Sequence, residues 1–155
     1  MKKKKNIPSS ASQLPIEDLK HLTRIEQKTL GISDLDDDNR PYVALKYYET
    51  RHQCFSEWDC SELRAFSSFV EKLKGVTWEM IWRSGGKPGK KDSFGFTKHK
   101  DRNNLPNNGN ALKNISPDID AFELRVTGKA RVHGFRMKSA FFLVWLDKDH
   151  EIYPQ

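Results

Sequence analysis

Apolar and polar residues alternate most regularly over the C-terminal segment 121–146. Successive side chains of a β-strand project to opposite faces of its sheet, so Phe122 and Leu124 fall on one face and Glu123 falls on the other. Two more runs of the same kind follow within the segment. The pattern therefore predicts a meander of three antiparallel strands, in which an apolar face lies opposite a charged one.

The loop between the first two strands decides which of their residues pair. A three-residue loop over 127–129, with Gly128 supplying the unusual backbone angles, keeps apolar side chains opposite one another. A two-residue loop would place Leu124 opposite Arg131, and such a slip turns every side chain to the wrong face. The expected pairs are Val126 with Ala130, Leu124 with Val132, Arg125 with Arg131, and Glu123 with His133.

The third strand, AFFLVWL, is apolar on both sides, as a central strand would be. Carrying the alternation through a turn at 137–139 predicts core positions for Phe141, Leu143 and Trp145, and opposite positions for Phe142, Val144 and Leu146. Past the strand the same alternation reaches Lys148 and His150, with Tyr153 near by. We call the resulting set the charged face, and it comprises Glu123, Arg125, Arg131, His133, Lys148 and His150.

Between residue 41 and the meander the sequence predicts one strand and two helices. The run PYVALKYYE, 41–49, is rich in aromatic and β-branched residues and indicates a strand. Apolar residues recur at helical spacing after Asp59, which forms a capping box with Glu62. Thr77 can cap a shorter helix, TWEMIWRS, which the glycines at 85–86 would end.

This order of elements predicts an α+β fold, with helices packed on one face of a small, mainly antiparallel sheet that ends in the three-strand meander. We expect a disordered basic tail over 1–14 and a single domain over 15–155. A helical extension over 15–31 opens that domain. The segment 85–120 is rich in Gly, Asn, Pro and Lys and is typical of a long basic loop.

Composition narrows the class of protein. The formal net charge of +6 favours contact with a polyanion such as nucleic acid, although four of the positive charges are the lysines 2–5. No apolar run approaches the roughly eighteen residues of a membrane span, and no signal-peptide pattern is present, so we expect a cytoplasmic protein without membrane contact. Cys54 and Cys60 match neither a zinc nor a redox motif and are expected to be free thiols.

The segment 85–120 also suits a single-stranded nucleic acid, because its cations could follow a phosphate backbone while Phe94 and Phe96 stack on bases. His99 lies among these residues. A solvated insertion without a partner is the alternative that the sequence leaves open. The expected nucleic-acid-binding residues are Lys87, Lys90, Lys91, Lys98, Lys100, Arg102 and Arg136.

A strand, a helical segment and a meander reading ELRV, ARVHGF and FFLVWL, closed by a basic residue, a His and a Tyr, resemble the RelE/ParE superfamily of toxin proteins. The resemblance spans Pro41 to Tyr153 without the long loop. It implies helices on one face of the sheet and a concave, positively charged face opposite. It also implies a toxin that cleaves mRNA, often on the ribosome, and that an antitoxin holds in check, whereas the ParE branch inhibits gyrase.

The resemblance gives roles to the charged face. Glu123 stands where some members are basic, and the 85–120 insertion and the first forty residues also depart from the compact family. The matching positions are Arg125 on the first meander strand, Arg131 on the second, and Lys148, His150 and Tyr153 in the C-terminal cluster.

Metal-independent cleavage of RNA needs a base for the ribose 2′-hydroxyl, cations for the pentavalent phosphorane and an acid for the departing 5′-oxygen. We expect no cofactor and no metal site, because the acidic and histidine residues over 147–151 alternate between faces. The expected catalytic set is Arg125 and Arg131 for the phosphate, His150 for proton transfer, Lys148 and Tyr153 assisting, and His133 as the second proton-transfer candidate.

The sequence leaves open whether the protein is an endoribonuclease. One alternative is a non-enzymatic RelE/ParE-fold protein that binds nucleic acid, or inhibits a protein target, through the same basic face. Another is that the charged face only forms solvent-facing ion pairs, since charged outer faces of antiparallel sheets are ordinary.

Overall fold

A computed structural model of the chain describes residues 40–85 and 93–153, which belong to one compact unit, Asp37–Gln155. The tail expected over 1–14 and the helix expected over 15–31 lie outside the described residues. So do Lys87, Lys90 and Lys91 of the expected nucleic-acid-binding set.

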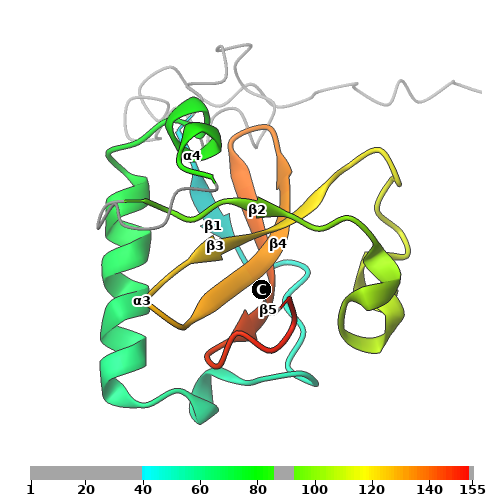
Figure 1. The fold of residues 1–155 in the computed structure, drawn as a ribbon, viewed down its shortest axis with the longest axis horizontal. Coiled ribbons are helices and arrows are strands. Elements are labelled where there is room, and N and C mark those ends of the chain that lie inside the picture. The colour runs from blue at the N-terminus through cyan, green and yellow to red at the C-terminus, as the bar shows by residue number, and fades with distance from the viewer. Residues whose placement is uncertain (1–39, 86–92, 154–155) are drawn as a thin grey trace, which may run out of the picture. The chain divides into compact units, whose positions relative to one another are not determined.

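The unit has the expected α+β class and is built on a five-stranded sheet with the order β1-β5-β4-β3-β2 (Figure 1). The strands are β1 (Tyr42–Ala44), β2 (Thr97–Lys98), β3 (Ala121–Arg125), β4 (Arg131–Met137) and β5 (Ala140–Asp147). β3, β4 and β5 form the antiparallel meander, while β1 runs parallel to β5 and β2 antiparallel to β3. The meander is therefore the middle of the sheet, with a short strand at each edge.

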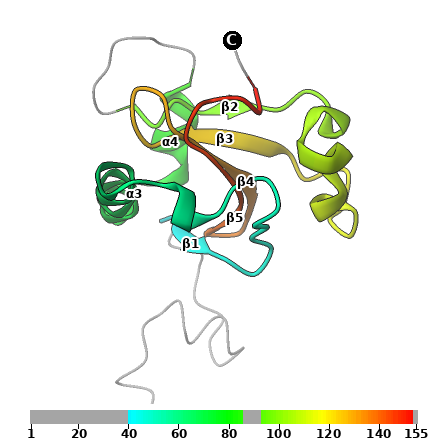
Figure 2. The ribbon, with the colours of Figure 1, turned by 90° about the horizontal axis from the view of Figure 1, so that it is seen from below.

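Two helices, α3 (Cys60–Leu73) and α4 (Trp78–Arg83), cover one face of the sheet (Figures 1 and 2). The predicted capping box opens α3: Asp59 accepts a hydrogen bond from the Glu62 amide, and the Glu62 side chain accepts one from the Asp59 amide. A 3₁₀ turn, η1 (Phe55–Glu57), precedes them.

Within the described ranges, no helix combines the length and apolar character needed to cross a membrane. The helix-side core includes Trp58, Phe69, Leu73, Trp78, Ile81, Phe122, Leu124, Val132, Phe141 and Leu143.

The opposite face of the sheet is covered as well. The expected long loop over 85–120 is structured in its described part, which holds β2 and two 3₁₀ helices, η2 (Arg102–Asn104) and η3 (Pro106–Leu112). Figure 2 shows η2 and η3 on the side of the sheet away from α3. Phe94 and Phe96 pack in the helix-side core, so they are not available to stack on bases. The second core comprises Leu105, Leu112, Ile115, Ala121, Phe135, Val144 and Trp145.

The register between β3 and β4 is the predicted one. Leu124 pairs with Val132, Arg125 with Arg131, and Glu123 with His133. The amides of Val126 and Thr127 both donate to the carbonyl of Ala130, which closes the three-residue loop. The charged residues of these two strands therefore share one face, as the hydrophobic pattern requires.

The register between β4 and β5 differs from the prediction. His133 pairs with Trp145, but the next residue, Gly134, pairs with Leu143, so β5 carries one extra residue in a β-bulge. Beyond the bulge the faces of β5 are exchanged. Trp145 lies on the face of His133 rather than in the helix-side core, and Leu146 lies in that core rather than opposite it.

Gly134 is the residue that permits the bulge, because a Cβ atom there would lie 1.9 Å from the carbonyl oxygen of Phe142. We expect Gly134→Ala to lower the free energy of unfolding by about 3 kcal/mol or more, since a backbone atom would have to move. Gly128→Ala is the matched control, because its Cβ would meet no described atom within 4 Å. Chemical denaturation of both variants checks this, and equal midpoints would contradict the bulge.

Candidate functional site

Five ionisable side chains meet where β2, β3, β4 and the turn after β5 come together. Glu123 and His133 face each other across β3 and β4, and His99 follows β2, with its amide donating to the Ala121 carbonyl. All but His150 are at most 6% exposed, and the His150 side chain is 17% exposed. We call this group the buried cluster, and it comprises His99, Glu123, His133, Asp147 and His150.

Asp147 fixes one side of the cluster. Its Oδ2 lies 3.1 Å from His133 Nε2, and its two carboxylate oxygens accept the amides of Glu151 at 2.8 Å and Ile152 at 2.9 Å. Burial raises the pKa of Asp147, but the hydrogen bonds from His133 and the two amides outweigh burial and lower that pKa to about 2. Because Asp147 is ionised and can only accept, the imidazole proton of His133 lies on Nε2. The other nitrogen, Nδ1, then carries a lone pair.

That lone pair faces the second histidine. His133 Nδ1 lies 2.9 Å from His99 Nε2, and the two rings are nearly parallel at 18°. Burial lowers the pKa of His133, and burial followed by the neighbouring His133 lowers the pKa of His99 to about 3. Both imidazoles are therefore neutral near pH 7, and His99 Nδ1 has no hydrogen-bond partner within the described ranges.

Glu123 occupies the centre of the cluster. Its Oε1 lies 3.3 Å from His150 Nε2 and 3.6 Å from Arg131 Nε, and its Oε2 lies 3.9 Å from His133 Nδ1. Burial raises the pKa of Glu123 to about 7, against the opposing charge of Arg131. Burial also lowers the pKa of His150, as does the nearby Arg131 charge. Oε2 has no hydrogen bond from any described residue, so this carboxylate is incompletely compensated.

The two predicted phosphate ligands have different surroundings. Arg131 is 6% exposed, and its Nη1 lies 3.0–3.4 Å from the four carbonyl oxygens of 127–130, which share its two N–H groups, so it fastens the loop rather than presenting an open fork. Arg125 is half-buried beside Gly95, and its Nε lacks a hydrogen-bond partner in the described part of the chain. Arg125 is therefore not committed to the loop in the way that Arg131 is.

The bulge removes Lys148 from the predicted face. Because β5 carries an extra residue, Asp147 rather than Lys148 lies on the face of Arg131, and Asp147 pairs with Arg131. Lys148 Nζ instead donates to the carbonyl of Glu57 at 2.9 Å. His150 still reaches Glu123, since the turn after β5 holds it at a φ of 58°. Tyr153 lies edge-on to His99, with 5.3 Å between the ring centroids.

The described members of the nucleic-acid-binding set are spread over the fold. Arg102 donates to the carbonyls of Ile115, Ser116 and Ile119 and so fastens the segment after η3. The Arg136 guanidinium lies over Trp78 and Trp82, 5.0 Å and 5.7 Å from the ring centroids. Lys98 forms an exposed ion pair with Asp120, and Lys100 is exposed. Arg102 and Arg136 therefore serve contacts within the fold rather than one binding surface.

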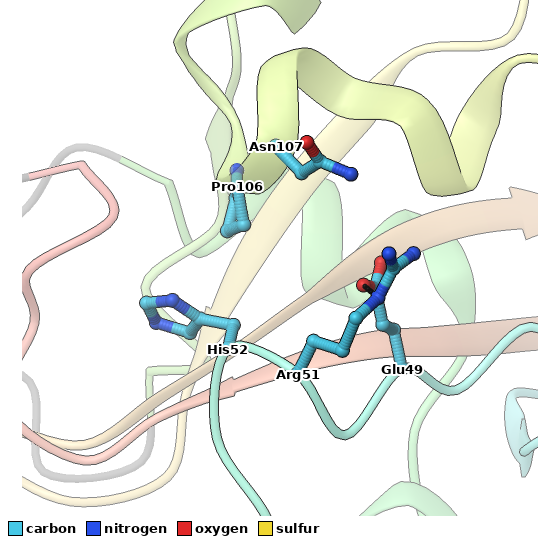
Figure 3. A pocket seen from close by; sticks show the side chains of 5 residues that line it. All are labelled: Glu49, Arg51, His52, Pro106 and Asn107. Carbon is cyan, nitrogen blue, oxygen red and sulfur yellow. Dashed lines mark hydrogen bonds and ion pairs between the residues drawn. The ribbon is translucent and has the colours of Figure 1, made fainter.

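A separate hollow of about 370 Å³ lies between the loop after β1 and the start of η3 (Figure 3). Its lining residues are Glu49, Arg51, His52, Pro106 and Asn107. Arg51 Nε lies 2.5 Å from Glu49 Oε1, so the acid and base that line it neutralise each other. This hollow shares no residue with the buried cluster.

No protein-family model, curated protein or solved structure matches this chain. The assignment of the site therefore depends on its own geometry. Sequence reasoning missed His99 and Asp147 as members of the cluster. Gly134 was the available signal for Asp147, because a glycine inside a strand often marks a bulge.

The substitution Asp147→Asn tests whether Asp147 anchors His133 and the turn after β5. An amide keeps the size of the side chain but accepts through one oxygen only, so at least one of three buried donors loses its acceptor. We expect a loss of about 2–3 kcal/mol in the free energy of unfolding, measured by chemical denaturation. Asp149→Asn is the matched control and should leave the midpoint almost unchanged, because the Asp149–Lys129 ion pair is exposed. Equal losses in the two variants would show that Asp147 is not the anchor.

Proposed function

We propose that the protein is an RNA-cleaving toxin of the RelE type and that cleavage takes place at the buried cluster. The observation that carries the proposal is the connected set of three imidazoles and two carboxylates with Arg125 and Arg131 beside it. Proton donors, proton acceptors and cations in one place are the groups that acid–base cleavage of a phosphodiester requires.

We assign the catalytic roles by how far each side chain is exposed to solvent. His150, Arg125 and Tyr153 are only partly buried, whereas the rest of the cluster is buried, so a phosphodiester that approaches from solvent meets these three first. In the proposed reaction a base takes the proton of the 2′-hydroxyl, the 2′-oxygen attacks phosphorus, and the bond to the 5′-oxygen breaks as that oxygen gains a proton. His150 takes the proton of the 2′-hydroxyl and delivers it to the departing 5′-oxygen, Arg125 binds the phosphate, and Tyr153 lies beside them.

Glu123 and Arg131 position these groups. Glu123 Oε1 lies 3.3 Å from His150 Nε2 and pairs with that ring when it carries a proton, and Arg131 offsets part of the carboxylate charge at 3.6 Å. Arg131 therefore acts on the reaction through Glu123, instead of binding the phosphate directly as expected from the sequence. The net charge of +6 supports attraction of a polyanion to the protein, a long-range effect that salt would weaken.

A toxin of this class is expected to have an antitoxin. Phe142, Val144 and Leu146, which the alternation places opposite the core, are not free for such a partner, because the fold itself buries Val144 and Leu146 and packs Phe142 in the second core. Large apolar side chains that remain exposed in the described ranges are the better candidates for that contact. They are Leu45, Leu63, Met80 and Met137.

The proposal predicts cleavage of RNA by the purified protein, either free or on translating ribosomes, with transcript ends mapped by primer extension. His150→Ala and Arg125→Ala should each slow cleavage by about 100-fold or more, since proton transfer and charge stabilisation are both lost. His52→Ala is the matched control and should cleave at the wild-type rate, because His52 lies outside the cluster.

Two results would contradict this proposal. One is intact RNA in both settings, even if the protein binds RNA in a salt-dependent way, which would favour the non-enzymatic alternative. The other is wild-type cleavage by folded His150→Ala protein, which would place the reaction elsewhere.

A further inference from the structure

Three atoms of the buried cluster have the chemistry and spacing of metal ligands. An imidazole nitrogen of His99, a carboxylate oxygen of Glu123 and an imidazole nitrogen of His133 all lie within 4.8 Å of one another. We infer that these three side chains bind one divalent transition-metal ion of the zinc class. The inference goes beyond RNA cleavage and does not depend on it.

The distances suit such an ion. Zinc binds imidazole nitrogen and carboxylate oxygen at about 2.0–2.2 Å, so two ligands of a tetrahedral ion lie about 3.3 Å apart. His133 Nδ1 lies 2.9 Å from His99 Nε2 and 3.9 Å from Glu123 Oε2. These two separations bracket the tetrahedral value, and the third, between His99 and Glu123, is within 4.8 Å, so side-chain rotations would admit an ion between the three atoms.

The sheet brings the ligands together before any ion arrives. Glu123 and His133 are direct cross-strand partners on β3 and β4, and the His99 amide is fixed to the neighbouring strand through Ala121. Ligands on adjacent strands keep their spacing without the help of a flexible loop. The site is therefore largely preformed.

Asp147 supplies the contact that orients a metal-binding histidine. A histidine ligand generally donates its other ring proton to a carboxylate or carbonyl, which fixes the tautomer and the direction of the lone pair. Asp147 accepts from His133 Nε2 at 3.1 Å and is itself held by two backbone amides. The lone pair at His133 Nδ1 is thus aimed at His99 and Glu123.

The Glu123 carboxylate lacks a partner that a bound cation would supply. A hydrogen bond between His99 and His133 satisfies their facing nitrogens without an ion, but it leaves Glu123 Oε2 with no hydrogen bond from the described residues. The residue is only 1% exposed, so bulk water does not compensate this oxygen. A cation between the three side chains would compensate Glu123 Oε2 and bind the two facing imidazole nitrogens.

The ligand set selects the kind of metal. Two imidazoles and one carboxylate suit zinc and its neighbours, whereas Mg²⁺ and Ca²⁺ prefer oxygen ligands alone. Three protein ligands also leave a fourth position open, as in sites where zinc holds a water or a substrate.

Titration calorimetry with ZnCl₂ on chelator-treated full-length protein tests the inference. Cys54→Ser/Cys60→Ser protein is the background, since both cysteines are free thiols that also bind zinc. We expect one equivalent to bind. His99→Asn and Glu123→Gln should each weaken binding by more than the roughly 10–100-fold that loss of an outer contact costs. His52→Ala in the same background should bind as tightly as its parent.

Cobalt(II) provides a second measurement on the unmutated cluster, because its visible absorption reports a nitrogen- and oxygen-ligated site of low coordination number. We expect that spectrum in the background protein and its loss on adding one equivalent of zinc. Absence of stoichiometric binding, or binding that folded His99→Asn and Glu123→Gln proteins retain in full, would overturn the inference.

The two proposals fail separately. One equivalent of zinc bound by a protein that leaves RNA intact supports the metal site and contradicts the cleavage proposal. RNA cleavage by a protein that binds no zinc supports the cleavage proposal and contradicts the metal site.

Discussion

The register shift between His133 and Gly134 determines which groups the buried cluster contains. Because β5 carries one extra residue, the carboxylate of Asp147 comes to the face of Arg131 and His133. Regular alternation would have brought the ammonium group of Lys148 to that face, and His133 Nε2 would then have no anionic acceptor. The shift in turn depends on Gly134, where a side chain would collide with the backbone of β5. The contact between Asp147 and His133 thus depends on the absence of one Cβ atom.

The contact between Asp147 and His133 matters for stability because both faces of the sheet are buried. An ionisable group away from water destabilises the fold unless hydrogen bonds or opposite charges compensate it. Asp147 is well compensated, and Arg131 is held by four carbonyls and one carboxylate. Glu123 Oε2 and His99 Nδ1 have no hydrogen-bond partner in the ranges described. Such groups are uncommon in protein interiors, and they are the reason that we propose a ligand or substrate at this site.

The sequence predicts the parts of this fold that repeat with a period. Alternation gave the three meander strands and the β3–β4 register, and helical spacing with a capping residue gave α3. The bulge breaks the alternation at Gly134, so the faces of Trp145 and Leu146 were wrong and Asp147 was missed. His99 was not recognised as a site residue because β2 has only two residues and leaves no periodic pattern. The role of Arg131 in the loop depends on carbonyl positions, which no side-chain pattern encodes.

The site depends on Asp147 fixing His133 with Nδ1 facing His99 and Glu123. Long-range ¹H–¹⁵N NMR correlation of the imidazole nitrogens tests this arrangement most directly, on metal-free protein near pH 7. It reports the tautomer of each histidine and the exchange rate of its ring proton. We predict that His133 is neutral, carries its proton on Nε2 and exchanges that proton slowly because Asp147 accepts it inside the protein. A His133 ring that is charged, carries its proton on Nδ1 or exchanges as fast as a surface histidine would contradict the account.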